Sequence, residues 1–241
     1  MNRPQLGASS KVLILTGAGV SAESGVPTFR GIGGLWEGRR VEEVASPEGF
    51  DADAKMVWRF YSLRREGAAK VAPNPGHLAI AKLEGKLGDR LLLATQNVDG
   101  LHARAGSKRM ICIHGELFKT RCEQCNVPFE DDKTYFDAVP ICSTCNTGRL
   151  RPHIVWFGEM LNPAHLAQID DFIERAGRDL VFFAIGTSGQ VYPAAGFVDA
   201  ARRVGGSCWL VDVDPSVDYA VRFDHVVRGK SGEVLPHLFG V

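Results

Sequence analysis

The sequence has no excess of charge of either sign and no long apolar run. Its 28 Lys and Arg residues balance 28 Asp and Glu residues over 241 positions. Proteins that bind nucleic acid or a membrane surface usually carry a basic excess or stripe, so we expect neither kind of partner. No apolar run approaches the length of a membrane span, and the first stretch, MNRPQLGASS, has no apolar signal-peptide core. We therefore expect a cytoplasmic location.

Cysteine is scarce outside two tight pairs. CEQC and CSTC give the spacing C-x2-C-x16-C-x2-C, and the other two thiols lie in apolar runs, where a thiol is usually a small buried hydrophobe. The paired spacing is typical of a four-thiolate zinc site, the alternative being four unpaired surface thiols. Four thiolates leave no place for water or substrate, so the ion would be structural, and such a motif alone does not indicate an enzyme. The predicted ligands are Cys122, Cys125, Cys142 and Cys145.

Short apolar runs alternate with helical patterns along most of the chain. The runs are KVLILTGAG, RLLLATQN, RMICIHG, DLVFFAIGTS and SCWLVDVD, and PGHLAIAKLEGKL is one of the helices between them. This alternation predicts an α/β fold, a Rossmann-like parallel sheet with helices on both faces. Two segments break it, so we predict one domain, 1–241, with a small zinc-binding lobe and a helical insertion. In this scheme 1–40, 74–116 and 151–241 form the Rossmann-like lobe, 41–73 the helical insertion and 117–150 the zinc-ribbon insertion.

Each predicted strand ends in small or polar residues, where open α/β sheets bind ligands. After the first strand, TGAGVSAESG approaches the G-x-G-x-x-G/A pattern, whose glycines let the backbone approach a pyrophosphate at the start of a helix. Such loops are common, and the acidic residue expected at the end of a second strand is missing. Asp212, at the end of a later strand, is the candidate for holding ribose hydroxyls instead. Among seven histidines, His114 alone lies at a strand tip, where a general base is useful near neutral pH.

The segment MVWRFYSLRRE, residues 56–66, predicts an amphipathic helix with an arginine on its apolar side. Phe60, Tyr61 and Leu63 lie on that side, and Arg64 leaves from the same face. Ser62 and Arg65 are expected on the outer side, together with Arg59 and Glu66. Arginine keeps its charge, so Arg64 must meet an anion or water. A structural ion pair or a snorkelling stem would also explain it.

Taken together, these motifs resemble the sirtuins, the NAD-dependent protein lysine deacylases. The matching stretches are GAGVSAESGVPTFRG, TQNVDGLHARAG, HGEL, the two CxxC pairs, PHIVWFGEML, GTSGQVYPAA and EVLP. They occur in the family's order from about residue 12 to residue 236, so the resemblance covers nearly the whole chain.

The resemblance implies a set of residues around NAD. The catalytic group would be His114 as the base, with Asn97 and Asp99. The cofactor contacts would be Gly17, Ala18, Gly19, Ser21, Ala22, Thr28, Phe29, Arg30, Trp36, Gln96, Asn97, Val98, Asp99, Gly186, Thr187, Ser188, Asp212, Val213, Asp214 and Ser231. Many sirtuins carry asparagine in place of Asp212 and alanine in place of Ser231. An aspartate can still accept from ribose hydroxyls, so we expect NAD binding to survive both departures.

The resemblance also implies the reaction. In sirtuins the acyl-lysine carbonyl oxygen attacks C1′ of the nicotinamide ribose and nicotinamide leaves. The histidine then helps a ribose hydroxyl attack the resulting imidate, and water releases lysine and O-acyl-ADP-ribose. Val155, Phe157, Gly158 and Glu159 would pair with the substrate peptide. The partners would be acylated lysine side chains, with neither nucleic acid nor membrane, and we expect a monomer. A mono-ADP-ribosyltransferase and a non-catalytic NAD- or zinc-binding module are the alternatives.

A Tyr-x-x-Arg pair marks the sirtuins that remove acidic acyl groups. Tyr61-Ser62-Leu63-Arg64 matches that pair, and Ala45 matches the small residue that widens their acyl pocket. The anion that Arg64 requires would then be the terminal carboxylate of a succinyl or malonyl group, with the tyrosine hydroxyl as a further donor.

Overall fold

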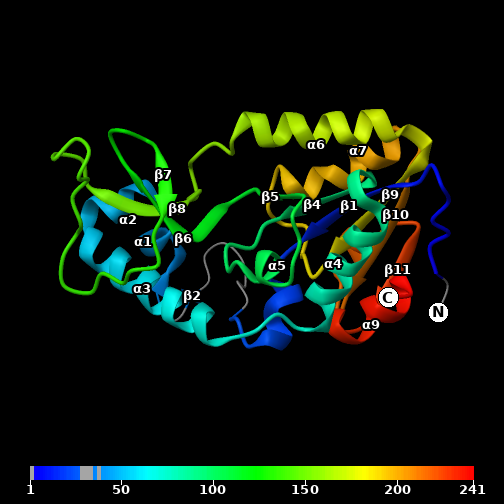
Figure 1. Cartoon of the computed structure of the whole chain (residues 1–241), viewed down its shortest axis with the longest axis horizontal. Helices are drawn as coiled ribbons and strands as arrows, with labels where there is room; N and C mark the ends of the chain where they lie inside the picture. The colour runs from blue at the N-terminus through cyan, green and yellow to red at the C-terminus, as the bar shows by residue number, and fades with distance from the viewer. Residues whose placement is uncertain (1–2, 28–34, 37–38) are drawn as a thin grey trace.

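The larger lobe is built on a six-stranded parallel sheet (Figure 1). The computed structural model describes residues 3–27, 35–36 and 39–241. The strands are β1 (Lys11–Thr16), β4 (Leu91–Thr95), β5 (Met110–Cys112), β9 (Leu180–Ile185), β10 (Ser207–Asp212) and β11 (His225–Arg228), in the spatial order β11-β10-β9-β1-β4-β5. β1 lies between β4 and β9, so the chain winds outward in both directions from it. Ligands bind at the carboxyl edge beside such a switch point.

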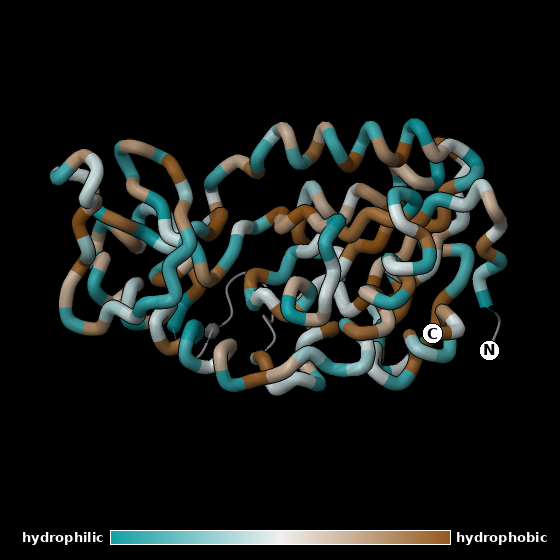
Figure 2. Tube along the Cα trace, in the orientation of Figure 1, coloured by the Kyte–Doolittle hydropathy of each residue, from teal (hydrophilic) through white to brown (hydrophobic). Residues whose placement is uncertain are grey.

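Helices cover both faces of this sheet, because successive residues of each buried strand point to opposite sides. Leu13 and Leu15 pack with α6 (Pro163–Ala176), α7 (Phe197–Arg203) and the segment around α8 (Val217–Ala220). Val12 and Ile14 pack with α4 (Pro75–Leu87) and α9 (Ser231–Phe239). The apolar residues accordingly concentrate along the central strands of this lobe (Figure 2). This arrangement confirms the predicted α/β class.

The smaller lobe has its own sheet and its own core (Figure 1). The antiparallel strands β6 (Gly115–Cys122), β7 (Pro128–Glu130) and β8 (Leu150–Ile154) pack against α1 (Val41–Val44), α2 (Pro47–Ala52) and α3 (Ala54–Lys70). Asp53 caps α3 by accepting a hydrogen bond from the backbone N–H of Met56 at 2.9 Å. β8 extends from Leu150 to Ile154 within this small sheet, and the residue boundaries between the lobes stay a prediction.

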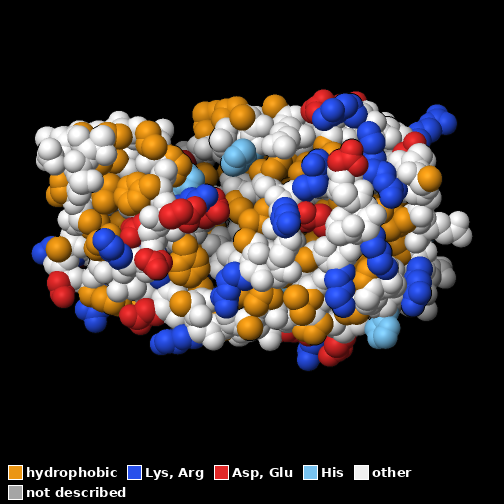
Figure 3. Space-filling view, in the orientation of Figure 1, with side chains coloured by type: hydrophobic (Ala, Val, Ile, Leu, Met, Phe, Trp, Pro, Cys, Tyr) orange, Lys and Arg blue, Asp and Glu red, His pale blue; other side chains and the backbone are white. Residues whose placement is uncertain are grey.

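Shorter elements complete the described chain. They are the 3-10 segments η1 (Ala18–Ser24), η2 (Gly88–Arg90), η3 (Gly177–Asp179) and η4 (Ala194–Gly196), the helix α5 (Leu101–Arg104), and the paired strands β2 (Leu35–Trp36) and β3 (Arg39–Arg40). Among the described residues, no helix combines the length and the apolar character that crossing a membrane requires. Charged side chains of both signs are distributed over the face of the molecule seen in Figure 3.

The predicted outer face of the helix at 56–66 is partly wrong. Arg65 is only 1% exposed and Ser62 is fully buried, whereas Leu63, placed on the apolar side, is 50% exposed. The reason is that α3 is covered on two sides. Tyr61 faces Trp156 beyond β8, and Arg65 faces β6 and the segment after β7. A buried polar side chain is stable there because its donors find backbone acceptors.

Candidate active site and metal centre

The carboxyl ends of four strands are tied together just beyond the large sheet. The backbone N–H of Gly17 donates to Ile185 O at 3.0 Å, and that of Gln96 donates to Thr16 O at 2.9 Å. Gly186 N donates to Val211 O at 2.9 Å. The predicted residues at the tips of β1, β4, β9 and β10 therefore lie along one edge.

The glycine loop packs directly on the tip of β9. A Cβ built on Gly17 would lie 2.6 Å from Gly186 O, and one on Gly19 would lie 2.7 Å from Gly186 Cα. Both glycines are thus required for backbone-to-backbone packing. The segment that follows is the 3-10 segment η1, in place of the α-helix that the glycine pattern implied. It ends at Gly25, whose φ of 89° is left-handed.

Ser21 organises the catalytic candidates. Its hydroxyl donates to Asp99 Oδ2 at 2.7 Å and accepts from Asn97 Nδ2 at 3.1 Å. Asp99 is buried, and its Oδ1 also accepts from the backbone N–H of Leu101 at 2.9 Å. The carboxylate is therefore fixed in place with its charge compensated by donors. Three of the predicted site residues meet here.

His77 is a member of this network that the sequence analysis did not identify. The backbone N–H of Asn74 donates to its Nδ1 at 3.3 Å, so Nε2 carries the proton and donates to Ser21 Oγ at 3.2 Å. Burial lowers the pKa of His77 to about 4, against the opposing charge of Asp99. It is therefore neutral at pH 7. The sequence signal was the capped start of α4, NPGH, which places His77 in the first turn, beside η1.

His102 contacts the threonine that ends β1 and, through it, is linked to the threonine that ends β4. Its Nε2 lies 3.0 Å from Thr16 Oγ1, which donates to Thr95 Oγ1 at 2.8 Å. Thr95 Oγ1 in turn accepts from the backbone N–H of Asn97 at 3.1 Å. Burial lowers the pKa of His102 to about 3, with a smaller effect from the neighbouring His77. This histidine was also missed, because its partners are hydroxyls distant in the chain.

His114 has the geometry of a general base. Its Nδ1 lies 3.2 Å from the carbonyl oxygen of Gln96, which can only accept, so Nδ1 is protonated and Nε2 keeps a free lone pair. Burial lowers the pKa of His114 below its ordinary value, partly offset by this bond. A neutral imidazole with Nε2 unprotonated is the form that can accept a proton.

The predicted nucleotide residues further along the edge differ in exposure. Gln96 Nε2 donates to Thr187 Oγ1 at 2.9 Å, while Ser188, Val213 and Asp214 are exposed. Burial raises the pKa of Asp212, whose Oδ1 accepts from the backbone N–H of Asp214 at 3.0 Å. Asp212 is half-buried, and its carboxylate is chemically suited to accept from ribose hydroxyls.

Ser231 lies at the start of α9 and is tied to η1. Its hydroxyl donates to Glu23 Oε2 at 3.2 Å, and the same oxygen accepts from Gly232 N at 2.7 Å. Glu23 therefore caps α9 from a distant part of the chain, as a side chain at the N-cap would. Nothing in the local sequence indicates this cap.

Ala18, Ala22 and Val98 complete the described nucleotide candidates, and Ala18 is half-buried at the start of η1. Ala22 is exposed on η1, and Val98 is half-buried after β4. The predicted residues Thr28, Phe29 and Arg30 lie outside the described residues. Trp36 lies in β2, and its side chain is likewise outside the described part.

The small lobe presents Tyr61 and Arg64 from adjacent turns of α3. Tyr61 is fully buried, and its hydroxyl accepts a hydrogen bond from Trp156 Nε1 at 2.9 Å. Burial raises the pKa of Tyr61 to about 12, and the nearby Arg64 guanidinium opposes that rise. The guanidinium carbon of Arg64 lies 5.7 Å from the centre of the Phe60 ring. The two groups that the sequence paired are thus near neighbours.

The predicted peptide-binding segment links this lobe to His114. Val155 N donates to His114 O at 2.9 Å, and Phe157 N donates to Ala45 O at 2.9 Å. Ala45 is buried, and Gly158 turns the chain with a φ of 88°. The segment therefore joins the base, the acyl-pocket candidate Ala45 and the turn at Glu159.

The carboxylate of Glu159 is bound within the protein. It accepts from Arg151 through both oxygens, at 2.7 and 2.9 Å, and from Arg121 at 3.0 Å. Trp156 N also donates to Glu159 Oε2, at 2.8 Å. These arginine contacts help hold the pKa of Glu159 below its ordinary value despite burial. Its side chain thus anchors the turn.

The four paired cysteines form one compact cluster in the small lobe. Their sulfur atoms lie within 4.8 Å of one another, and the sulfurs of Cys122 and Cys145 are 3.7 Å apart. Zinc–sulfur bonds of about 2.3 Å in a tetrahedron place sulfurs about 3.8 Å apart, so the residues fit one structural zinc ion.

The backbone around the cluster favours thiolates. Cys122 Sγ accepts from the N–H groups of Gln124 and Cys125, at 3.3 and 3.4 Å. Backbone N–H groups, including that of Gly148 at 3.2 Å, lower the pKa of Cys145 to about 6. A Cβ on Gly148 would collide with Cys122 Sγ, so glycine is required there.

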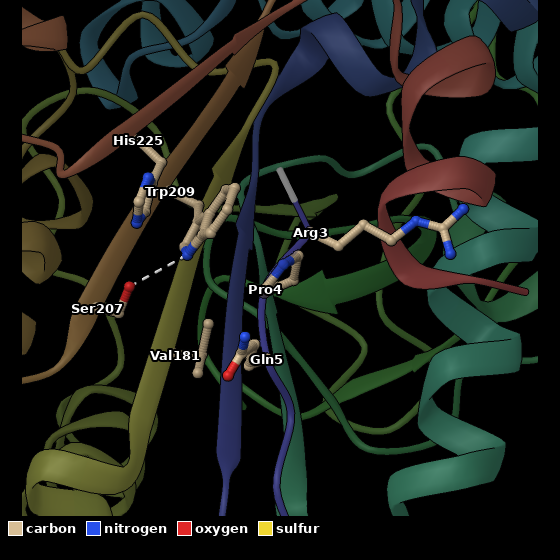
Figure 4. A pocket seen from close by; sticks show the side chains of 7 residues that line it. All are labelled: Arg3, Pro4, Gln5, Val181, Ser207, Trp209 and His225. Carbon is tan, nitrogen blue, oxygen red and sulfur yellow. Dashed lines mark hydrogen bonds between the residues drawn. The ribbon is translucent and has the colours of Figure 1, made fainter. Parts of the chain in front are cut away.

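Cavities lie at both edges of the large sheet in the described part of the chain, one beside the catalytic candidates and one at the opposite edge. A cavity of about 220 Å³ lies behind the loop after β4, lined by Asn97, Asp99 and His102 among others. A cavity of about 740 Å³ lies at the amino ends of β9, β10 and β11 (Figure 4). There the ring of Trp209 stacks on His225 with centroids 3.9 Å apart, and its indole N–H donates to Ser207. This second cavity is at the opposite edge from the catalytic candidates.

Comparison with known proteins agrees with this geometry. The model of the Sir2 family matches residues 17–193. An NAD-dependent protein deacylase of Pasteurella multocida is 47% identical over 231 residues, which cover 94% of this chain and 95% of that protein. NAD-dependent protein deacylase 2 of Pyrobaculum aerophilum is 45% identical over 240 residues, covering 99% and 94%.

Solved structures show the same fold. A crystal structure of a Sir2 homologue–NAD complex has a TM-score of 0.86 at 43% identity and covers 96% of this chain and 89% of its own. A structure of Sir2 bound to acetylated peptide has a TM-score of 0.81 at 28% identity, covering 95% and 92%. The chain therefore belongs to the Sir2 family, in which its curated relatives are NAD-dependent protein deacylases.

Proposed function

We propose that this chain is an NAD-dependent protein lysine deacylase that removes acetyl groups and also acidic acyl groups such as succinyl and malonyl. Acyl-lysine, NAD and one water are consumed, and the products are the free lysine, nicotinamide and O-acyl-ADP-ribose. The observation that carries the activity lies at the carboxyl edge of the parallel sheet, in a chain of this family. There Ser21 bonds both Asn97 and Asp99, and His114 bonds the carbonyl of the adjacent Gln96. Bound NAD supplies an electrophilic ribose carbon with nicotinamide as its leaving group.

The chain's own residues position and exchange protons. Asn97 and Asp99 are held by Ser21, so their polar groups keep one orientation while a ribose is bound. His114 Nε2 would accept a proton from a hydroxyl of the bound ribose, and Nδ1 holds the ring in place through Gln96 O. The segment at Val155 to Glu159 pairs with the substrate backbone beside His114.

The preference for acidic acyl groups rests on Arg64 and Tyr61. Arg64 is half-buried next to the fully buried Tyr61, so a carboxylate between them would meet a cation and a hydroxyl donor away from bulk water. A hydrogen bond to a charged group contributes about 1.5–3 kcal/mol, which corresponds to about 10–100-fold in affinity. An acetyl group does not reach these residues and is the poorer substrate in affinity.

The test compares acyl groups on one peptide. Arg64→Met should lower the ratio of kcat/KM for succinyl-lysine over acetyl-lysine by about 10–100-fold. Arg59→Met is the matched control, because Arg59 is exposed on the same helix. Equal losses on both peptides in Arg64→Met would refute the preference while leaving the deacylase proposal intact. Absence of any NAD-dependent turnover by the wild-type chain would refute the deacylase proposal itself.

A further inference from the structure

The hydroxyl of Tyr61 is buried, and its oxygen already accepts one hydrogen bond. Trp156 Nε1 donates to it at 2.9 Å, and within the described residues this is its one hydrogen bond. A phenol also carries a proton of its own to donate. A buried O–H without an acceptor is costly, so this group is suited to an acceptor that enters from a substrate.

The indole that donates to Tyr61 is packed between a guanidinium and an aromatic ring. The guanidinium carbon of Arg151 lies 3.3 Å from the centre of the Trp156 ring, and the Phe50 ring lies 5.3 Å away by centroids. Arg151 is itself fixed by the two carboxylate oxygens of Glu159 and by Ile154 O. The indole therefore cannot turn its N–H away from Tyr61 without disturbing this set of contacts.

The cation above the ring also strengthens the bond. A guanidinium over an indole face is attracted to the ring's electrons and withdraws density from them, which makes the N–H a better donor. A hydroxyl that accepts a stronger hydrogen bond becomes a stronger donor in turn. The contacts therefore run from the Glu159 carboxylate to Arg151, from Arg151 to the Trp156 ring, and from the indole N–H to the Tyr61 hydroxyl. They leave the Tyr61 O–H more polarised than a free phenol.

We propose that Trp156 is a positioning residue for acyl selectivity. Its indole N–H occupies the acceptor side of the Tyr61 hydroxyl, so the Tyr61 O–H points to the terminal carboxylate of an acidic acyl group. The inference rests on the proposed preference for acidic acyl groups. An acetyl group offers no acceptor at this place, so the contribution of Trp156 is selective for acidic substrates.

The protonation state of Tyr61 agrees with a donor role. Burial raises the pKa of Tyr61 to about 12, even with Arg64 beside it. The group therefore stays a neutral hydroxyl near neutral pH, which donates to a carboxylate, rather than a phenolate, which would repel it.

The experiment removes the indole N–H and keeps an aromatic ring. Trp156→Phe should raise KM for a succinyl-lysine peptide about three- to tenfold more than KM for the acetyl-lysine peptide, with a smaller change in kcat. Trp58→Phe is the matched control. Trp58 is a fully buried indole on α3 whose Nε1 donates to Leu150 O at 2.8 Å, so this variant loses an equivalent bond without touching Tyr61. Its succinyl-to-acetyl ratio, meaning kcat/KM for succinyl-lysine divided by kcat/KM for acetyl-lysine, should match that of the wild type.

A double-mutant comparison separates positioning from packing. In a Tyr61→Phe background, adding Trp156→Phe should change the succinyl-to-acetyl ratio no further, because the hydroxyl that Trp156 orients is already gone. Additive effects on the ratio would overturn the proposal. Equal rises in KM for both peptides in Trp156→Phe would also overturn it.

Three further outcomes separate the two proposals from a failure to fold. If Trp156→Phe does not fold, benzothienylalanine at position 156 keeps the bicyclic ring, replaces N–H by sulfur and must lower the same ratio. If Arg64→Met and Tyr61→Phe leave the ratio unchanged, the proposed acidic preference is wrong. If those two lower it and Trp156→Phe does not, only the role of Trp156 is wrong.

Discussion

Replacing Arg65 with methionine tests how the small lobe is held together. The Arg65 guanidinium bridges α3 to the small sheet and to the segment after β7. Nε donates to Leu117 O at 2.7 Å, and Nη2 donates to Lys119 O at 3.1 Å and to Thr120 Oγ1 at 2.9 Å. Nη1 donates to Lys133 O at 2.5 Å and pairs with Asp131 at 3.3 Å. Methionine fills much of the space and satisfies none of these acceptors.

The expected cost follows from what is left behind. Removing one partner of a buried ion pair destabilises a protein by about 3–5 kcal/mol. Asp131 keeps a bond from Thr120 Oγ1 at 2.5 Å and weaker contacts from the Tyr135 hydroxyl, so the lower end of that range applies. For a chain of this size, about 3 kcal/mol corresponds to a fall in Tm of roughly 6–12 °C.

The assay is thermal unfolding of the zinc-loaded protein, followed by circular dichroism. Arg59→Met is the control, since Arg59 is exposed on the same helix and its loss should shift stability by no more than about 0.5 kcal/mol. If Arg65→Met melts within 2 °C of the control, roughly 0.5–1 kcal/mol, the bridge does not stabilise the lobe as described.

Three further predictions concern the metal, the base and pH. Gly148→Ala should reduce bound zinc, measured by atomic absorption, well below one ion per chain, since its Cβ would displace Cys122 Sγ. Gly67→Ala is the control and should keep full occupancy, because a Cβ added there meets no atom within 4 Å. Full zinc in Gly148→Ala would contradict the described cluster. His114→Ala should lower kcat by about 10²–10⁴-fold, and unchanged acyl-lysine turnover in this variant would show that His114 is not the base. For the wild type, kcat/KM should be level at neutral pH and fall at acidic pH, because the pKa of His114 lies below its ordinary value. The free energy of unfolding, measured by urea titration, should decrease as pH falls from about 6.5 to about 4. His77 and His102, with pKa values of about 4 and about 3, stay neutral in the folded chain while the unfolded chain takes up protons, and each contributes about 1.4 kcal/mol per pH unit. Equal stability at pH 5 and pH 7 would contradict their burial.

Much of the large lobe could be predicted because its determinants are local. The apolar runs at β1, β4, β9 and β10 are buried strands, and the helical pattern PGHLAIAKLEGKL is α4 over its whole length. The ends of parallel strands meet at one edge, so polar tips such as Gln96 and Thr187 could be assigned to a common site from the sequence. The cysteine cluster was predictable for a similar reason, since its spacing reflects the ligand geometry itself.

The remaining features depend on contacts between distant segments. Arg65 binds backbone carbonyls 52 to 68 residues away, and carbonyls leave no trace in a residue pattern. His77 and His102 look like ordinary helical positions until Ser21 and Thr16 are brought beside them. Helix periodicity also identifies one buried face well, but α3 is covered on two faces. The prediction therefore placed the exposed Leu63 on the apolar side and the buried Arg65 on the outer side.

The most direct test of the account is mass spectrometry of acetyl-, succinyl- and malonyl-lysine peptides incubated with the wild-type protein, with and without NAD. We expect NAD-dependent loss of all three acyl groups, release of nicotinamide with each, and lower KM values for the two acidic groups than for acetyl. Loss of acyl groups without NAD, or no loss with it, would contradict the proposed activity. Turnover of acetyl-lysine alone would contradict the acyl pocket formed by Tyr61 and Arg64.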